Sequence, residues 1–325
     1  MPLLEVRGLQ KTYNGRRVVD NVDFHVGQAE IVGLLGPNGA GKSTTFRMVM
    51  GMIRAEAGEV KCNDEVVSRL PMFRRVRRGM GYLAQEPSIF RNLKVEENLM
   101  AVLETQPLNR QERQQRLAEL LSDLGLTRLA ASRAHTLSGG EKRRLEIARA
   151  LITNPAILLL DEPFSGVDPK ACADIQKIIA SLRARGMSIL ITDHNVFETF
   201  TIADRVYIIH DGRVLKHGTP EDLINDKQAQ RLYLGDKFDQ FGAAFQNLRQ
   251  QIAEKSAAAP APRIGRTTLI IRQEEEQHRH ATSEKFYQEE SAHRAALTKT
   301  ISPTARKETP PEKKPVEANE NGEKK

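Results

Sequence analysis

The sequence predicts an α/β fold with a largely parallel sheet. Through residues 1–241, short apolar segments of strand length alternate with segments of helical periodicity, which is the rhythm of repeated strand–helix–strand units. Residues 30–35 form a more continuous apolar run, and such a run suits a strand that is covered on both faces. This run leads directly into a glycine-rich loop and then into a helix expected over residues 42–52.

The other elements of this domain are predicted from local patterns. Residues 3–6 and 22–26 alternate apolar and polar side chains, as half-buried strands do. Further strands are expected at residues 80–83, 157–160, 188–192 and 205–209, with helices over 169–185 and 196–201. Thr219, Pro220 and Asp222 predict one more helix start, because Thr caps a first turn, Pro fits it, and the acid completes a capping box.

Two later changes in composition predict further organisation. Residues from about 95 to 150 are rich in Leu, Glu, Arg and Gln, so we expect a helical subdomain inserted into the α/β core. We place the domain end at residue 241 and treat residues 242–325 as a tail. The tail is expected to be weakly helical and then disordered, because Pro, Glu, Lys and Asn dominate its end. A short amphipathic helix is predicted where apolar residues share one helical face: Phe241, Phe245, Leu248 and Ile252.

The bulk composition limits the possible functions. The formal charge of +7 is spread along the chain without a basic block, so no nucleic-acid partner is expected. Cys62 and Cys172 have no metal-ligand or redox spacing and predict buried thiols in a reducing compartment. We expect no signal peptide, and no run approaches the roughly 18 apolar residues that a spanning helix needs. If the protein serves membrane transport, other chains are expected to form the pathway through the membrane.

The strongest functional signal is a complete phosphate-binding loop, Gly36-Pro37-Asn38-Gly39-Ala40-Gly41-Lys42-Ser43. Small residues let backbone N–H groups surround phosphate oxygens, and the helix that follows offers its positive end. Lys42 is expected to reach the β- and γ-phosphates, and the Ser43 hydroxyl to help hold Mg²⁺. A plain glycine-rich turn is the alternative, but the strand before the loop and the helix after it favour nucleotide binding.

A second signal is the pair of acids that ends the strand predicted at residues 157–160. An Asp at this place, here Asp161, can hold magnesium, and a following Glu, here Glu162, can orient the attacking water. Acids also follow strands simply to begin a turn. Because they accompany the phosphate-binding loop, the catalytic interpretation is favoured, and together the two motifs indicate a P-loop NTPase.

A third motif, Leu137-Ser138-Gly139-Gly140-Glu141, precedes the acidic strand and opens a helix expected over residues 142–151. A Ser-Gly-Gly helix start is another anion site. One nucleotide does not need a second phosphate-binding helix from the same chain so far along the sequence. Two chains arranged head to tail would use it, with each ATP between the loop of one subunit and the Ser138 helix of the other.

The order and spacing of these motifs over roughly residues 3–240 resemble the nucleotide-binding domain of ABC transporters. The resemblance implies an antiparallel β part near the N-terminus and a Mg²⁺- and ATP-dependent ATPase that works as a homodimer. It also implies two transmembrane permease subunits as partners, with this chain on the cytoplasmic face of the inner membrane and in contact with the membrane only through them.

The same resemblance implies roles for particular residues. The implied catalytic residues are Lys42, Glu162 and His194, the last as a sensor of the γ-phosphate. The implied magnesium ligands are Ser43, Gln85 and Asp161. The implied nucleotide contacts include Tyr13 against adenine and the residues Gly36, Pro37, Asn38, Gly39, Ala40, Gly41, Lys42, Ser43, Thr44, Gln85, Ser138, Gly139, Gly140 and Asp168.

Within this family, several stretches resemble the ATPase of lipopolysaccharide-export transporters: residues 15–19, 31–36, 82–91, 98–103, 160–164, 191–196 and 233–235. This resemblance implies that the homodimer drives extraction of lipopolysaccharide, and that Phe90 and Arg91 grip short helices of the membrane partners. Core packing is the alternative for Phe90. Ala84 replaces a proline and Ser43 a threonine that the family pattern has, and neither change removes a hydrolytic group.

The tail and two other functions stay open at this point. The resembling ATPases end near residues 234–241, so the tail is either a solvated extension or carries a helix at 241–252 that docks on the dimer or a partner.

The same motifs also serve ATPases for branched-chain amino acid uptake or for export of another lipid. A non-transport ABC ATPase acting on DNA or ribosomes is disfavoured, because neither a second set of motifs nor a long coiled coil is present.

Overall fold

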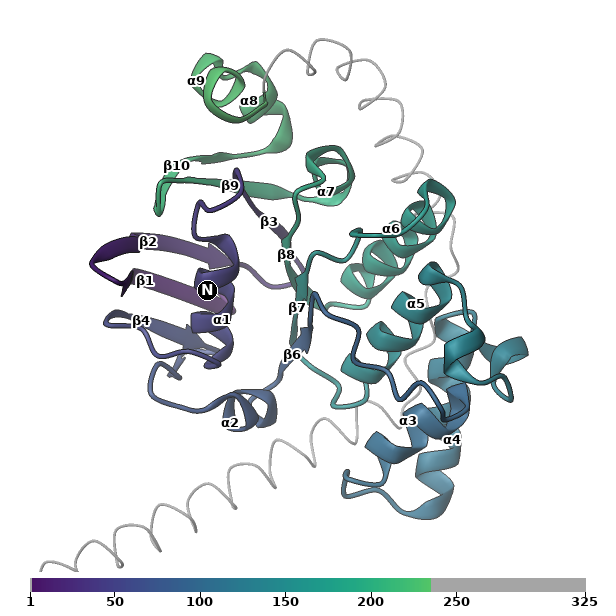
Figure 1. Ribbon diagram of the computed structural model, residues 1–325. Helices are drawn as coiled ribbons and strands as arrows, with labels where there is room; N and C mark the ends of the chain where they lie inside the picture. The colour runs from purple at the N-terminus through teal and green to yellow at the C-terminus, as the bar shows by residue number, and fades with distance from the viewer. Residues whose placement is uncertain (1, 235–325) are drawn as a thin grey trace, which may run out of the picture. The chain divides into compact units, whose positions relative to one another are not determined.

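The computed structural model describes residues 2–234, which form two sheets and the helices that cover them (Figure 1). The larger sheet has the strand order β10-β9-β3-β8-β7-β6. Its strands are β3 (Ile31–Leu35), β6 (Met80–Leu83), β7 (Ile157–Asp161), β8 (Ser188–Thr192), β9 (Arg205–His210) and β10 (Arg213–Gly218). Neighbouring strands from β6 to β9 run parallel, and β10 pairs antiparallel with β9. The prediction of a largely parallel sheet is confirmed.

The smaller sheet lies near the N-terminus and is antiparallel, which confirms the second part of the predicted fold class. It has the strand order β2-β1-β4-β5. Its strands are β1 (Leu4–Tyr13), β2 (Arg16–Val26), β4 (Ala57–Cys62) and β5 (Glu65–Val66).

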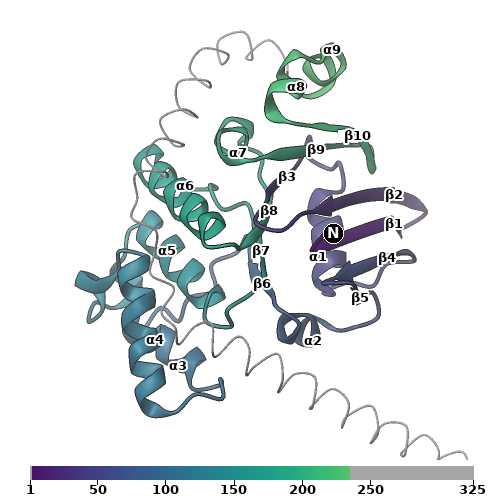
Figure 2. The same cartoon turned by 180° about the vertical axis from the view of Figure 1, so that it is seen from behind.

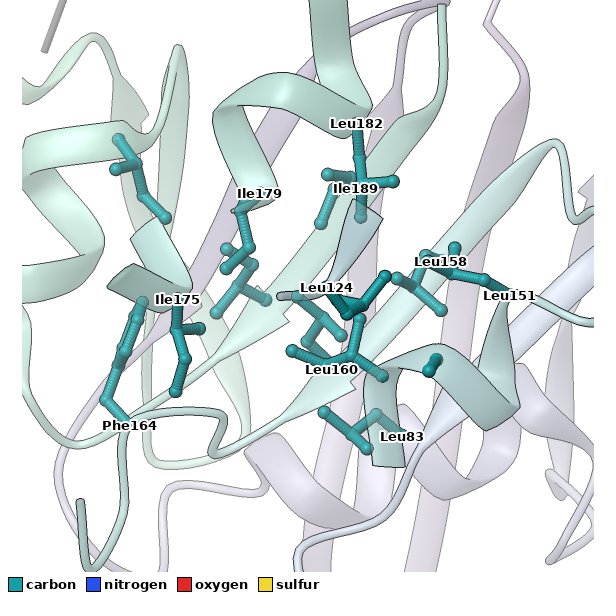
Figure 3. Close-up of a cluster of buried hydrophobic side chains, with 14 of the residues drawn as sticks. Leu83, Leu124, Leu151, Leu158, Leu160, Phe164, Ile175, Ile179, Leu182 and Ile189 are labelled. Carbon is teal, nitrogen blue, oxygen red and sulfur yellow. The ribbon is translucent and has the colours of Figure 1, made fainter. Parts of the chain in front are cut away.

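The central strands β3, β7 and β8 are buried at every position because both faces of the larger sheet are covered. In β7, Leu158 and Leu160 belong to one buried cluster, whereas Ile157 and Leu159 belong to another. Successive side chains of a strand point to opposite faces, so each strand contributes to both clusters. Figure 3 shows Leu158 and Leu160 together with Ile175 and Ile179 of the covering helix. This two-sided burial fixes the register of the strands that carry the functional residues at their ends.

The helices are distributed over the two faces of the larger sheet, as Figures 1 and 2 show. Helix α1 (Lys42–Met50) lies between the two sheets. Helices α5 (Gly139–Ala150), α6 (Pro169–Ala184) and α7 (Val196–Ile202) lie on the other face of the larger sheet. The remaining α-helices among the described residues are α2 (Met72–Arg77), α3 (Val95–Leu103), α4 (Arg110–Asp123), α8 (Pro220–Asn225) and α9 (Lys227–Ala229).

The helical segment expected between about residues 95 and 150 is confirmed as α3, α4 and α5, which the chain inserts between β6 and β7. These helices bury their leucines in the same cluster as one face of β7. Asn109 caps α4 by accepting a hydrogen bond from the backbone N–H of Glu112. The predicted capping box at Thr219 is also present, because its hydroxyl accepts from the Asp222 N–H at 3.2 Å and the Asp222 carboxylate accepts in return.

Several boundaries and elements differ from the sequence prediction. The first two strands are longer than expected, at 10 and 11 residues, because β1 is paired on both sides. Strands β4, β5 and β10 were not predicted. Helix α1 ends at Met50 rather than residue 52, because Gly51 adopts a left-handed conformation (φ 73°) and caps it. Helix α5 begins at Gly139 rather than residue 142.

The predictions for the tail lie outside the described residues, and the domain boundary at residue 241 stays a prediction. Within residues 2–234, none of the helices is both long enough and apolar enough to cross a membrane.

Candidate active site

The phosphate-binding loop connects the carboxyl end of β3 to the first residue of α1. Gly41 precedes the helix with φ 100°, a left-handed conformation, and a Cβ atom there would lie 2.5 Å from the carbonyl oxygen of Val18. Only glycine fits such a position without strain. The backbone N–H groups of the first turn of α1, which includes Ser43 and Thr44, have no partner inside the helix and suit an anion.

Lys42 lies folded over this loop. Its side chain is 8% exposed, and its Nζ donates hydrogen bonds to the carbonyl oxygens of Gly36 at 2.7 Å and Pro37 at 3.0 Å. Burial lowers the pKa of the Lys42 ammonium from its ordinary value. Asn38 and Gly39 at the tip of the loop are exposed. The loop therefore presents a cation and free N–H groups at the same end of α1.

Asp161 ends β7 beside two hydroxyl donors that sequence reasoning missed. Thr192 Oγ1 donates to its carboxylate at 2.7 Å, and the Tyr82 hydroxyl donates at 3.3 Å. These residues come from β8 and β6, the two neighbours of β7, and Asp161 is directly opposite Thr192 in the register. Asp161 is 1% exposed, and burial raises its pKa. A carboxylate held in this way is stabilised in its charged form by a cation.

Two other predicted site residues, Gln85 and His194, contact or lie close to the Glu162 carboxylate. The Gln85 Nε2 donates to Glu162 Oε2 at 2.9 Å, and the His194 Nδ1 lies 3.5 Å from the same oxygen. Glu162 has φ 47°, an unusual conformation for a residue with a side chain. Its backbone N–H donates to the carbonyl of Thr192 at 2.7 Å, which attaches this turn to the end of β8.

Asp193 is a third residue that sequence reasoning did not single out. It is fully buried, and its carboxylate accepts from the backbone N–H groups of Phe164 at 3.0 Å and Asn195 at 2.8 Å. Burial raises the pKa of Asp193. It therefore joins the turn after Glu162 to the turn that carries His194. The sequence indicates this connection only through the fact that the two turns follow β7 and β8, which are both strands of the parallel sheet.

The Ser138 motif opens α5 with a complete capping box. The Ser138 hydroxyl accepts from the Glu141 N–H at 3.3 Å, and the Glu141 carboxylate accepts from the Ser138 N–H at 2.8 Å. A Cβ atom on Gly140 would lie 2.4 Å from the Cβ of Ala171. Asp168 caps α6 in that same region, accepting from the N–H of Ala171 at 3.1 Å. The motif and Asp168 are therefore neighbours in one chain.

The remaining predicted nucleotide contacts are the Ser138 motif and Tyr13. Among the residues that the structure describes, no hydrogen bond links residues 138–140 to the phosphate-binding loop, and α5 and α1 lie on opposite faces of the larger sheet (Figures 1 and 2). Tyr13 ends β1 with its side chain 44% exposed, and the Lys11 ammonium lies 5.4 Å from the centre of its ring. Tyr13 is thus accessible to an adenine ring.

Known proteins resemble the part of the chain that contains these site residues. Residues 19–165 match the protein-family model described as ABC transporter. The chain is 51% identical over 236 residues to the lipopolysaccharide export system ATP-binding protein LptB of Acidithiobacillus ferridurans, a match that covers 73% of this chain and 98% of that protein. It is 50% identical over 239 residues to LptB of Escherichia coli strain K12, covering 73% and 99%.

Solved structures give the same result for the fold. The dimeric structure of an ATP-binding cassette bound to ADP and Pi, in a post-hydrolysis state, matches with a TM-score of 0.60 at 25% identity. That match covers 67% of this chain and 98% of the other. Since the relatives are matched over nearly their whole length at about half identity, the chain belongs to the family of ATP-hydrolysing subunits of ABC transporters.

Proposed function

We propose that this ATPase works as a homodimer that powers the export of lipopolysaccharide, on the cytoplasmic face of the inner membrane. The proposal that lipopolysaccharide is the transported substrate is supported by one observation. The chain is 50–51% identical to proteins named for lipopolysaccharide export, over 98–99% of their length.

Phe90 and Arg91 form the candidate docking surface for two transmembrane permease subunits. The Phe90 side chain is available for such a contact, because it is 46% exposed. The Arg149 guanidinium lies 4.7 Å from the centre of the Phe90 ring.

The hydrolytic step is assigned to the residues around Glu162. The phosphates of ATP would bind at the start of α1 with Lys42, and Glu162 would orient the attacking water. Because Gln85 and His194 both reach Glu162 Oε2, they would report whether the γ-phosphate is present. Adenine would stack on the exposed ring of Tyr13.

The three residues proposed to hold Mg²⁺ have suitable donor atoms. Asp161 has a buried carboxylate, Ser43 a hydroxyl and Gln85 an amide oxygen, and oxygen atoms are the ligands that Mg²⁺ prefers. Asp161 has no ion pair among residues 2–234, so a cation would compensate its buried charge. When bound, Mg²⁺ neutralises negative charge on the phosphate oxygens.

The proposed dimer is head to tail because each chain holds half of a complete site. Ser138 caps a helix of 12 residues whose first N–H groups suit an anion, yet in one chain this helix, α5, and helix α1 lie on opposite faces of the larger sheet. A second copy would place its Ser138, Gly139 and Gly140 over the phosphates bound at Lys42. Asp168, beside this motif, would lie at the same dimer interface.

A heterodimer experiment tests this arrangement. One chain carries Lys42→Ala and the other Ser138→Asp, and the heterodimer is isolated through two different affinity tags. Asp is chosen because it keeps the helix cap but places a carboxylate near the γ-phosphate. In a head-to-tail dimer both defects fall in the same site, so the other site stays intact and about half of the wild-type hydrolysis rate is expected.

The matched control places both substitutions in the same chain, paired with an unchanged chain. Each site then carries one defect, and hydrolysis is expected to fall to the level of the Lys42→Ala homodimer. Equal rates from the two heterodimers would contradict the head-to-tail arrangement.

The cargo is tested by affinity purification of the tagged full-length chain from its native membrane, followed by mass spectrometry. Two multi-spanning proteins with large periplasmic domains are expected, and the purified complex is expected to carry lipopolysaccharide. Recovery of permeases together with a periplasmic solute-binding protein would replace export by uptake. The proposed ATPase mechanism would stand in that case.

A further inference from the structure

Arg143 is the most highly connected buried side chain near Glu162, and the proposed mechanism does not use it. It lies in α5, is 6% exposed, and carries a guanidinium whose three nitrogens all donate. Four backbone carbonyls and one carboxylate accept its hydrogen bonds: Ala84 O at 2.9 Å, Asp161 O at 2.9 Å, Glu162 O at 3.0 Å, Pro163 O at 3.3 Å and Glu146 Oε2 at 2.9 Å.

These carbonyls belong to the two segments that meet at the site. Ala84 directly precedes Gln85, and the other backbone acceptors include Glu162 itself and the residue on each side of it. The side chains of Gln85 and Glu162 are themselves 2.9 Å apart. One guanidinium therefore fixes the backbone on both sides of this side-chain contact.

The backbone of Glu162 needs such support. Its φ of 47° is a left-handed conformation, which is strained for a non-glycine residue and persists only when its surroundings hold it. Arg143 binds the carbonyl of Glu162 and the two carbonyls beside it, while Thr192 accepts from its N–H at 2.7 Å. Glu162 is thus held in this conformation from both directions.

Glu146 holds the guanidinium in place one turn further along α5. It is 4% exposed, and while one oxygen pairs with Arg143, the other accepts from the backbone N–H of Ser88 at 3.1 Å. The pair consequently connects the segment that leads to Phe90 with the turn at Glu162. A lysine could not replace Arg143 here, because its single nitrogen cannot span acceptors on two segments as a planar guanidinium does.

We propose that Arg143 is a positioning residue for ATP hydrolysis: it holds Glu162 and Gln85 in the arrangement that orients the attacking water, and Glu146 orients Arg143. The inference rests on the proposed catalytic role of Glu162. Arg143 is expected to affect the chemical step rather than nucleotide binding, because its contacts are with backbone near Glu162 and not with the phosphate-binding loop.

The test measures kcat and KM for ATP in the full-length Arg143→Gln variant. We expect kcat to fall about 10- to 100-fold, as when a catalytic group is misplaced, with KM within about threefold of the wild-type value. Arg143→Lys is expected to recover only part of kcat. Arg116→Gln is the matched control, because Arg116 also donates to a carbonyl at the end of α5, Leu151 O at 3.1 Å, but far from Glu162. Its kinetics are expected to match the wild type.

A second, milder variant keeps the proposal testable if Arg143→Gln does not fold. Glu146→Gln keeps an oxygen for the Ser88 N–H but loses the ionic partner of Arg143, and kcat is expected to fall about 3- to 10-fold, the effect of one weakened charged hydrogen bond. Wild-type kcat in both Arg143→Gln and Glu146→Gln would overturn the proposal, as would a loss expressed mainly in KM.

Non-additivity separates this inference from the proposed role of Glu162. If Arg143 acts through Glu162, adding Arg143→Gln to Glu162→Gln is expected to cause no further loss of hydrolysis. A full additional loss in the double variant would show an independent structural effect and would reject the inference. If Glu162→Gln alone kept wild-type hydrolysis, the proposed role of Glu162 would fail first, and the inference with it.

Discussion

Replacing Glu162 by Gln is expected to lower the rate of ATP hydrolysis about 10²- to 10⁴-fold, the range for loss of a general base, while ATP stays bound. Gln has the shape of Glu, so its amide oxygen can still accept from Gln85 Nε2, which lies 2.9 Å from Glu162 Oε2. The substitution removes the negative charge and the proton acceptor without opening a cavity. The variant is therefore expected to trap the ATP-bound dimer.

Two measurements check this expectation. Single-turnover hydrolysis gives the rate, and size-exclusion chromatography with and without ATP gives the oligomeric state. Glu119→Gln is the control, since Glu119 lies on α4 and pairs with Arg116 rather than with a site residue. A Glu162→Gln chain that stays monomeric with ATP would count against the proposed dimer.

Replacing Lys42 by Ala is expected to weaken ATP binding by roughly 100-fold, which corresponds to about 3 kcal/mol for a buried, hydrogen-bonded charge pair. Lys42 is held over the loop by the carbonyls of Gly36 and Pro37, so its ammonium is positioned before the phosphates arrive. Burial already lowers its pKa, and the negative phosphates would reverse that effect by favouring the charged form.

Titration with a fluorescent ATP analogue measures this change in affinity. Lys177→Ala is the control, because Lys177 is an exposed lysine that pairs with Asp174 on α6. Its affinity for the analogue is expected to equal that of the wild type. An unchanged affinity in the Lys42 variant would contradict the assignment of the loop.

The features that the sequence predicted well are those set by neighbouring residues. The phosphate-binding loop between a strand and a helix, and the capping box at Thr219, depend on contacts between residues close together along the chain. The parallel strands were predictable because burial on both faces favours a nearly continuous run of apolar side chains. Asp161 and Glu162 were found because they directly follow such a run.

Other features depend on how distant segments pair. Strand β10 has a mixed burial pattern at the edge of the sheet, and β4 begins with two exposed residues, so neither shows a clear periodicity. Thr192 and Tyr82 reach Asp161 only because β8 and β6 are the neighbours of β7. Arg143 reads in the sequence as one of several basic residues on a polar helix, and nothing local distinguishes it from Arg144.

The sequence by itself determined which groups are available for chemistry: the glycine-rich loop with Lys42, the acids Asp161 and Glu162 at the end of β7, and the Ser-Gly-Gly helix start at Ser138, each encoded within a few consecutive residues. The tertiary structure alone decided which of these groups meet. Gln85, Glu162 and His194 converge because the strands they follow, β6, β7 and β8, are adjacent and parallel. By contrast, α5, which Ser138 caps, and α1, which begins with Lys42, lie on opposite faces of the same sheet. Strand order is set by the packing of two hydrophobic clusters over the whole domain, and no short stretch of sequence specifies it.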